Sequence, residues 1–132
     1  AAEYGHASLV KFLLDQGADI NGASSIGYTP LILACEKGHF NVVEVLVDRG
    51  NVNIEALRDS WSAILYAVYY GFLDIVKYLI SKGADIKRTA KRSVNALMTA
   101  AEQGHLEMVK FLLDSGNFDI QESDTTGNTA LI

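Results

Sequence analysis

Residues 2–17 read AEYGHASLVKFLLDQG, and residues 101–116 read AEQGHLEMVKFLLDSG. The two stretches share eleven of sixteen letters across a separation of 99 residues, which is too close a match for chance. Two sets of glycines divide this separation into steps of 33 residues: Gly5, Gly38, Gly71 and Gly104, and then Gly17, Gly50, Gly83 and Gly116. A fixed spacing of this size indicates a solenoid, in which each unit buries its apolar face against its neighbours.

The first half of each unit is predicted to be a short helix. Thr29-Pro30-Leu31 favours a helix start, because Thr caps free backbone N–H groups and Pro suits the first helical position. The other copies keep a capping residue there, as Ser62-Ala63, Asn95-Ala96 and Thr129-Ala130. Leu31, Ala34 and Cys35 give the helix a buried stripe, and we expect it to end near Gly38.

The second half of each unit is predicted to be another helix followed by a turn. After a Gly-His step, Val42, Val43, Leu46 and Val47 form an apolar face, which recurs as Ile75, Val76, Leu79 and Ile80. We expect this helix to end near Gly50 or Gly83. The stretch GADINGASSIGY at 17–28 is rich in turn-forming residues and is interpreted as an extended turn or hairpin.

Composition places the chain among soluble globular proteins. Of its 132 residues, 49% are hydrophobic and 20% charged, and the net charge of −5 gives no general attraction to nucleic acid or anionic membrane. The single cysteine, Cys35, cannot form an internal disulfide, which favours a cytoplasmic or nuclear setting. The longest charge-free apolar stretch, from Ala63 to Leu73, is eleven residues, against about 18 needed to span a bilayer, so we expect no membrane insertion.

The unit is similar to an ankyrin repeat, since it carries TPLILACEKGH at 29–39 and GADIN at 17–21. The resemblance covers essentially the whole chain. It implies an all-α solenoid of stacked helix-turn-helix units, whose turns project as fingers beside a concave row of first helices, and a role in binding. In this register residues 1–132 form one domain with a partial repeat at 1–23, complete repeats at 24–56, 57–89 and 90–123, and the start of another at 124–132. The chain is therefore expected to be a fragment of a longer array.

Two departures from the family pattern concern the turns. The glycines Gly27 and Gly127 are replaced by Ser60 and Ser93 in the middle units, where a positive φ is less comfortable, so we expect the central fingers to bend differently. One extra residue follows Gly50 and another follows Gly116, which predicts bulged linkers.

No pattern in the sequence indicates catalysis, a cofactor or a metal site. His6, His39 and His105 occupy the same repeat position, which points to a structural role. Successive helical layers lie about 8–10 Å apart, so stacked histidines cannot share a zinc ion that needs each ligand nitrogen about 2 Å away. Cys35 falls at a packing position, and no Gly-rich phosphate loop follows a strand pattern. We expect the protein not to be an enzyme.

The best candidates for binding are residues that vary between units at the finger tips and at the ends of the first helices. Aromatic residues and Arg are enriched at interface hot spots, and several fall on or near one groove. A ring in this set can instead pack between units. The predicted partner-binding residues are Tyr28, Lys37, Arg58, Trp61, Tyr69, Tyr70, Lys91, Arg92, Glu102 and Gln103.

Three functions remain open at this point. The leading one is a non-catalytic, monomeric scaffold that binds a protein or peptide partner through the concave groove and finger tips. The second is a sensor domain that binds a nucleotide, a short oligonucleotide or another phosphate-rich ligand through Trp61, Tyr69, Tyr70 and the basic finger at 81–93, where five Lys and Arg residues face one acid, Asp85. The same finger could also pair with an acidic or phosphorylated peptide. The third is an elastic spacer without a ligand. An alternative for the basic finger is a solvated turn.

Overall fold

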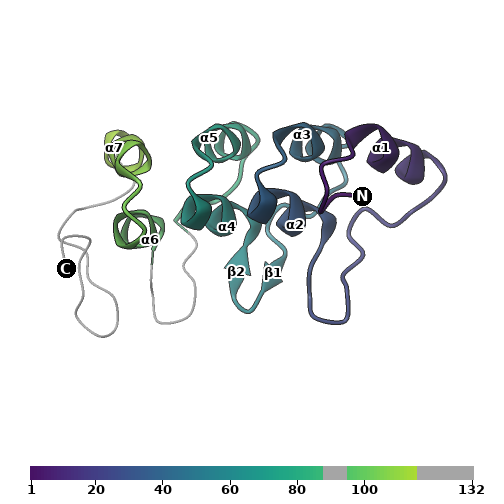
Figure 1. Cartoon of the computed structure of the whole chain (residues 1–132), viewed down its shortest axis with the longest axis horizontal. Coiled ribbons are helices and arrows are strands. Elements are labelled where there is room, and N and C mark those ends of the chain that lie inside the picture. The colour runs from purple at the N-terminus through teal and green to yellow at the C-terminus, as the bar shows by residue number, and fades with distance from the viewer. Residues whose placement is uncertain (88–94, 116–132) are drawn as a thin grey trace.

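The structure is a computed structural model that describes residues 1–87 and 95–115. Its helices and strands are α1 (Ala7–Asp15), α2 (Pro30–Lys37), α3 (Phe40–Asp48), β1 (Leu57–Arg58), β2 (Trp61–Ser62), α4 (Ala63–Tyr70), α5 (Leu73–Ser81), α6 (Ala96–Glu102) and α7 (Leu106–Asp114). Figure 1 shows α1, α3, α5 and α7 in one row and α2, α4 and α6 in a second row beneath it, with the connecting segments projecting below. The predicted stack of helix-turn-helix units is confirmed, and a short strand pair accompanies it.

Side-chain caps mark the start of two of the first helices. The Thr29 hydroxyl oxygen accepts a hydrogen bond from the backbone N–H of Ile32 at 3.2 Å, and the Asn95 side chain accepts one from Met98 at 2.9 Å. Ser62 stands at the same position in the unit between them and forms no such cap. With or without the cap, the helices α2, α4 and α6 begin at intervals of 33 residues, as the period predicts.

The core lies between the two rows of helices. Val42, Val43 and Leu46 on α3 are completely buried, and so are Ile75, Val76 and Leu79 on α5. On α2 the predicted stripe of Leu31, Ala34 and Cys35 is buried as well. Each second helix thus packs its apolar face against the first helices, and the apolar periodicity of the sequence is confirmed.

Successive units are joined by a ring that lies against a glycine. Gly5, Gly38 and Gly71 all have a positive φ, from 75° to 81°. A Cβ atom at these positions would lie 2.8 Å from the His39 ring, 2.6 Å from the Phe72 ring and 2.8 Å from the His105 ring, respectively. Only glycine tolerates both the left-handed backbone and this close approach.

The histidine rings add a hydrogen bond to this contact. The Nε2–H group of His39 donates to the Glu3 carbonyl oxygen at 2.8 Å, and that of His105 donates to the Tyr69 carbonyl oxygen at 2.8 Å. Phe72 keeps the ring contact and has no such donor. His39 and His105 therefore hold the preceding unit, which agrees with the structural role inferred from their repeat position.

The two described fingers close differently, as predicted. In the first, Gly27 has a φ of 88° and its N–H group donates to the Ser24 carbonyl oxygen at 2.9 Å. In the second, Arg58 pairs with Trp61 across an antiparallel ribbon, and the two residues between them, Asp59 and Ser60, both have positive φ values of 50° and 69°. A two-residue loop with two left-handed residues matches the right-handed twist of a hairpin. The turn is thus tight with Ser60 at the position that Gly27 occupies in the first finger.

The second helices are tied by a polar contact as well. The Tyr78 hydroxyl on α5 donates to Asp48 Oδ1 at the end of α3 at 2.8 Å, and the Tyr78 ring packs edge-on against Phe40 with centroids 5.3 Å apart. Burial, helped by the hydrogen bond to Asp48 and its charge, raises the pKa of Tyr78 from 10.0 to about 12.

The glycine contact between units is tested by Gly71→Ala beside Gly83→Ala. Both glycines have positive φ values, so each change should cost about 1–2 kcal/mol of folding free energy for the backbone alone. A Cβ at Gly83 meets nothing within 4 Å, whereas at Gly71 it displaces His105 from the Tyr69 carbonyl. Urea unfolding should therefore show a lower midpoint for Gly71→Ala than for Gly83→Ala. Equal midpoints would show that the ring contact adds no stability.

The contact between Tyr78 and Asp48 should make stability depend on alkaline pH. The folded state keeps the phenol proton to a higher pH than the unfolded state, so this contribution is present below pH 10 and is lost as the pH rises through about 12. Tyr78→Phe should therefore lose less stability than the parent chain between pH 9 and pH 12, as measured by urea midpoints. Tyr4→Phe, at a ring that is 70% exposed, serves as the control. Parallel curves for Tyr78→Phe and the parent would contradict this origin.

Candidate functional site

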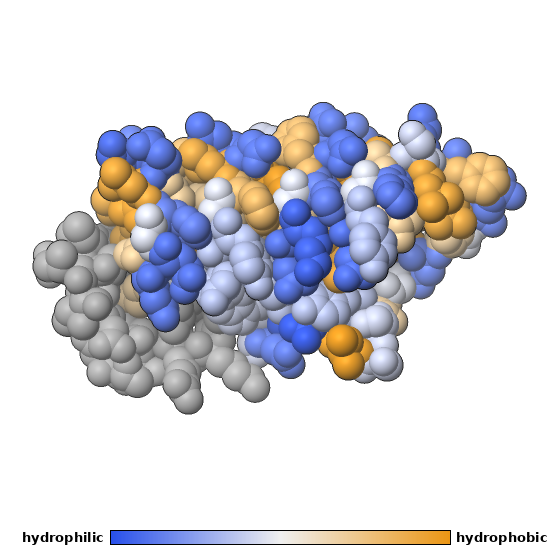
Figure 2. Space-filling model, in the orientation of Figure 1, coloured by the Kyte–Doolittle hydropathy of each residue, from blue (hydrophilic) through white to orange (hydrophobic). Residues whose placement is uncertain are grey.

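The surface over the first helices differs from that over the second helices. In Figure 2 the orange, hydrophobic side chains gather along the row of α1, α3, α5 and α7, whereas the surface over the other row is mostly blue or pale. On α4, Tyr66 stands three residues before Tyr69 and four before Tyr70, so both of the later rings are its neighbours on the helix surface. Trp61 on β2 precedes this helix and joins them.

These four rings contact one another, and Trp61 and Tyr66 also pack against the edge of the core. The centroids of Trp61 and Tyr66 lie 5.6 Å apart, those of Trp61 and Tyr69 lie 5.7 Å apart, and those of Tyr69 and Tyr70 lie 4.8 Å apart. The angles between the ring planes are 57°, 70° and 74°, so the rings meet as walls at an angle instead of stacking flat. Tyr70 remains 46% exposed.

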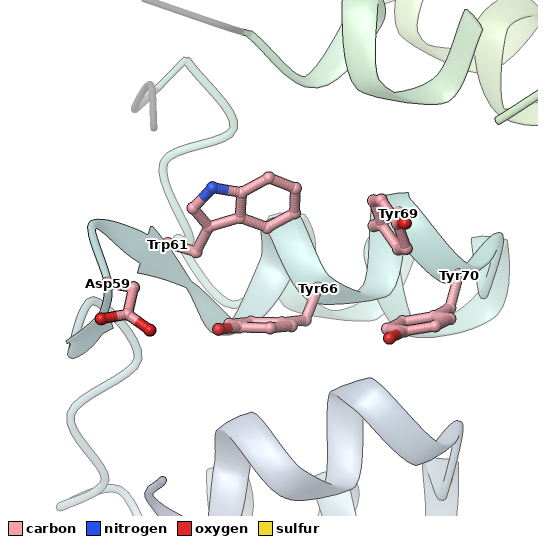
Figure 3. Close-up of a pocket in the computed structure, with 5 residues that line it drawn as sticks. All are labelled: Asp59, Trp61, Tyr66, Tyr69 and Tyr70. Carbon is pink, nitrogen blue, oxygen red and sulfur yellow. The ribbon is translucent and has the colours of Figure 1, made fainter. Parts of the chain in front are cut away.

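The rings surround a hollow of about 240 Å³, the α4 pocket, lined by Asp59, Trp61, Tyr66, Tyr69 and Tyr70. Figure 3 shows Trp61 and Tyr69 on the side of α4 toward α6, Tyr66 and Tyr70 on the side toward α2, and Asp59 at the hairpin end. The hollow is smaller than the roughly 300–1,000 Å³ usual for small-molecule sites. Its size suits one side chain of a larger partner.

Arg58 holds Tyr66, one wall of this pocket, in position. Its Nε donates to the Ile26 carbonyl oxygen of the preceding finger at 3.0 Å, and Nη1 donates to the Tyr66 hydroxyl oxygen at 3.0 Å. The guanidinium carbon also lies 4.0 Å from the centre of the Tyr28 ring. Arg58 therefore links two fingers and fixes the position of one pocket wall.

Two carboxylates give the edge of the pocket a negative character. Asp59 is in the lining, with its side chain 81% exposed, and one of its oxygens lies 3.5 Å from Arg58 Nη1. Glu36, at the end of α2, accepts a hydrogen bond from the Tyr28 hydroxyl at 3.4 Å. Burial raises the pKa of Tyr70, and the negative charge of Glu36 raises it further.

Comparison with known families agrees with the repeat pattern. A family model described as ankyrin repeats in three copies matches residues 1–90. The chain belongs to the ankyrin-repeat family. A second model, described as ankyrin repeats in many copies, matches residues 79–132. Ankyrin repeats are generally protein-protein interaction modules. A search among curated proteins found no match to this chain.

The residues predicted to bind a partner fall into three groups in this ankyrin array. Trp61, Tyr69 and Tyr70 come together in the α4 pocket. Tyr28 and Arg58 are engaged in contacts between units, so a role for them in partner binding stays a prediction. Three others are exposed at the ends of first helices: Lys37, Glu102 and Gln103.

Part of the basic finger lies outside the described residues, which include 81–87 and not 88–94. Arg88, Lys91 and Arg92 lie outside the described residues, as do Ser93, Gly127 and the linker after Gly116.

Sequence reasoning missed Tyr66, which forms one wall of the pocket and accepts a hydrogen bond from Arg58. The signal is present in the letters YAVYY at 66–70, because Tyr66 stands three residues before Tyr69 and four before Tyr70 on a predicted helix. Tyr66 lies in the middle of α4, whereas the predicted binding residues were confined to finger tips and helix ends.

Other chemistry is sparse in the part of the chain that the structure describes. Cys35 is completely buried, and burial raises the pKa of its thiol well above the ordinary value, which suppresses the reactive thiolate. Residues 1–87 and 95–115 contain no group of three or more His, Cys, Asp or Glu side chains that could hold a metal ion. Within the same residues, every helix is too short or too polar to cross a membrane.

A double-mutant cycle tests whether Arg58 supports the pocket wall. Arg58→Lys removes the planar group that reaches Ile26, Tyr28 and Tyr66, and Tyr66→Phe removes only the hydroxyl acceptor. Each single variant should lower the urea midpoint. The urea midpoint of the double variant should fall by less than the sum of the two single decreases, because both changes remove the same hydrogen bond. Additive losses would mean that Arg58 and Tyr66 act independently.

Proposed function

We propose that this ankyrin array is a non-catalytic solenoid scaffold that binds a protein or peptide partner through the groove of its first helices and fingers. The α4 pocket, in the proposed repeat 57–89, would hold an anchoring side chain of the partner. Glu102 and Gln103 in the next repeat and Lys37 in the preceding one would contact the same partner along the groove. A monomeric state and a cytoplasmic or nuclear location remain predictions.

The observation that carries this proposal is the cluster of four aromatic side chains beside the first helices, where Tyr70 is 46% exposed and the other three rings are half-buried. Aliphatic residues such as Leu65 and Val68 on the same helix fill the core, whereas the rings lie at its edge and keep part of their surface accessible. Exposed aromatic side chains lose little conformational freedom on binding and bury a large area, which is why they dominate hot spots. Trp61, Tyr69 and Tyr70 are therefore better explained by a partner than by packing alone.

The charges near the pocket do not favour the alternative of a nucleotide or another phosphate-rich ligand at this place. Glu36 and Asp59 are acidic, and Arg58 is already bonded to Ile26 and Tyr66. A phosphate at the rim would meet like charge. Binding through Lys91 and Arg92 stays a prediction, since both lie outside the described residues.

Selection from a random peptide library tests the proposal even though the partner is unidentified. Peptides that bind the parent chain should bind Tyr70→Ala about thirtyfold more weakly or worse, since loss of a hot-spot side chain costs about 2 kcal/mol. Tyr4→Ala is the matched control, because Tyr4 ends the corresponding segment of the first unit and is 70% exposed. Unfolding midpoints of both variants should stay near that of the parent.

Two results would count against this function. Equal affinity of the selected peptides for the parent, Tyr4→Ala and Tyr70→Ala would remove the pocket from the binding surface. A library that yields no binder to the folded parent would support the spacer role instead.

A further inference from the structure

We infer that the α4 pocket accepts a weakly hydrated cation, namely the methylated ammonium group of a lysine side chain in the partner. This inference rests on the proposed function, since it specifies the side chain that the pocket would anchor. It is carried by three features of the site: the angles between the rings, the charge at its edge, and the small number of hydrogen-bond acceptors in its lining.

The ring angles allow a single group to face several π-systems. Tyr69 meets Trp61 at 70° and Tyr70 at 74°, and Trp61 meets Tyr66 at 57°. Rings that meet at such angles form the sides of a corner, as Figure 3 shows, rather than a flat stack. The face of each ring carries the negative part of its quadrupole, which attracts a cation within about 6 Å of the centroid.

The charge at the edge of the pocket has the sign that a cation requires. Asp59 lines the pocket, and the Glu36 carboxylate acts on Tyr70. Arg58 Nη1 lies 3.5 Å from the Asp59 carboxylate and offsets part of its charge, while two hydrogen bonds hold the guanidinium toward Ile26 and Tyr66. Lys37 is exposed beside Glu36, and water screens its charge. The chain as a whole carries a net charge of −5.

The lining favours a methylated ammonium over an unmodified one. An unmodified lysine brings three N–H donors, and burying them without acceptors is unfavourable. The Tyr66 hydroxyl oxygen already accepts from Arg58, and Asp59 is largely in water, which leaves the hydroxyls of Tyr69 and Tyr70 as acceptors for the three donors. Methylation removes the donors and spreads the charge over apolar groups, so that less hydration is lost on entry. The same rings can then contact both the charge and the methyl groups.

Trp61 allows this inference to be tested directly, because it is the only tryptophan in the chain. The probe is Nα-acetyl-Nε-trimethyl-lysine methylamide, titrated into the full chain while Trp61 fluorescence is recorded. Its neutral isostere, with a carbon in place of the charged nitrogen, has nearly the same shape. We expect a saturable change with the cation and about two- to thirtyfold weaker binding of the isostere, the range that cation–π contacts support. Unmodified lysine should also bind more weakly.

Variants distinguish the contribution of the rings from that of the charge. Tyr69→Leu keeps an apolar side chain and removes a π face, so it should weaken binding of the cation more than binding of the isostere. Glu36→Gln should weaken binding of the cation at low salt and have little effect at high salt, because salt already screens the attraction between Glu36 and the cation. Tyr4→Leu, at an exposed ring outside the pocket, should leave binding of the probe unchanged.

The outcomes separate this inference from the proposed function. Equal affinity for the cation and the neutral isostere would overturn it. A loss of probe affinity with Tyr4→Leu as large as that with Tyr69→Leu would also overturn it. If the probe does not bind while library-selected peptides depend on Tyr70, the cation inference is wrong and the scaffold function stands. If neither the probe nor any peptide depends on the pocket, both are wrong.

Discussion

The contact on which the array depends is the ring of one unit placed against the left-handed glycine of the unit before it. His39, Phe72 and His105 lie so close to Gly5, Gly38 and Gly71 that a Cβ atom would come within 2.6–2.8 Å of a ring. Where the ring is histidine, its N–H group also binds a backbone carbonyl of the preceding unit. Each unit thereby fixes the position of the next, and the aliphatic faces of the helices are buried by the stacking that results.

The helix faces buried by this stacking are mainly aliphatic, and the aromatic residues of α4 lie at the edge of the core, where part of their surface remains accessible. Their arrangement still depends on the stacking, since Arg58 holds Tyr66 while it is itself held by Ile26 and Tyr28 of the preceding finger. The turn that carries Asp59 has two left-handed residues other than glycine, and the pairing of Arg58 with Trp61 closes it. A binding surface built in this way requires the neighbouring unit to be in place.

The exchange of histidine for Phe72 takes place in the unit that carries the pocket. Phe72 gives up the hydrogen bond to the preceding unit and retains the contact with Gly38. Its ring also lies nearly parallel to that of Tyr70, with centroids 6.5 Å apart and an angle of 27°. Phe72 thus contacts both Tyr70 of the α4 pocket and Gly38 of the preceding unit. It links the proposed anchor site to the contact that positions the repeat.

The sequence alone determined the features that depend on period and on local preference. These are the helix starts at Thr29 and Asn95, the buried faces of the second helices, the glycine positions, and the grouping of Trp61, Tyr69 and Tyr70 near one groove. Only the tertiary structure decided how Arg58 is used, that Tyr66 belongs to the pocket, and that Ser60 keeps a positive φ. The physical reason is that these outcomes depend on the directions of individual side chains and on the closure of one turn, which a repeat spacing does not specify. Arg58 reaches Ile26 and Tyr28 of the preceding unit and Tyr66 of its own, and the pairing of Arg58 with Trp61 closes the turn that holds Ser60.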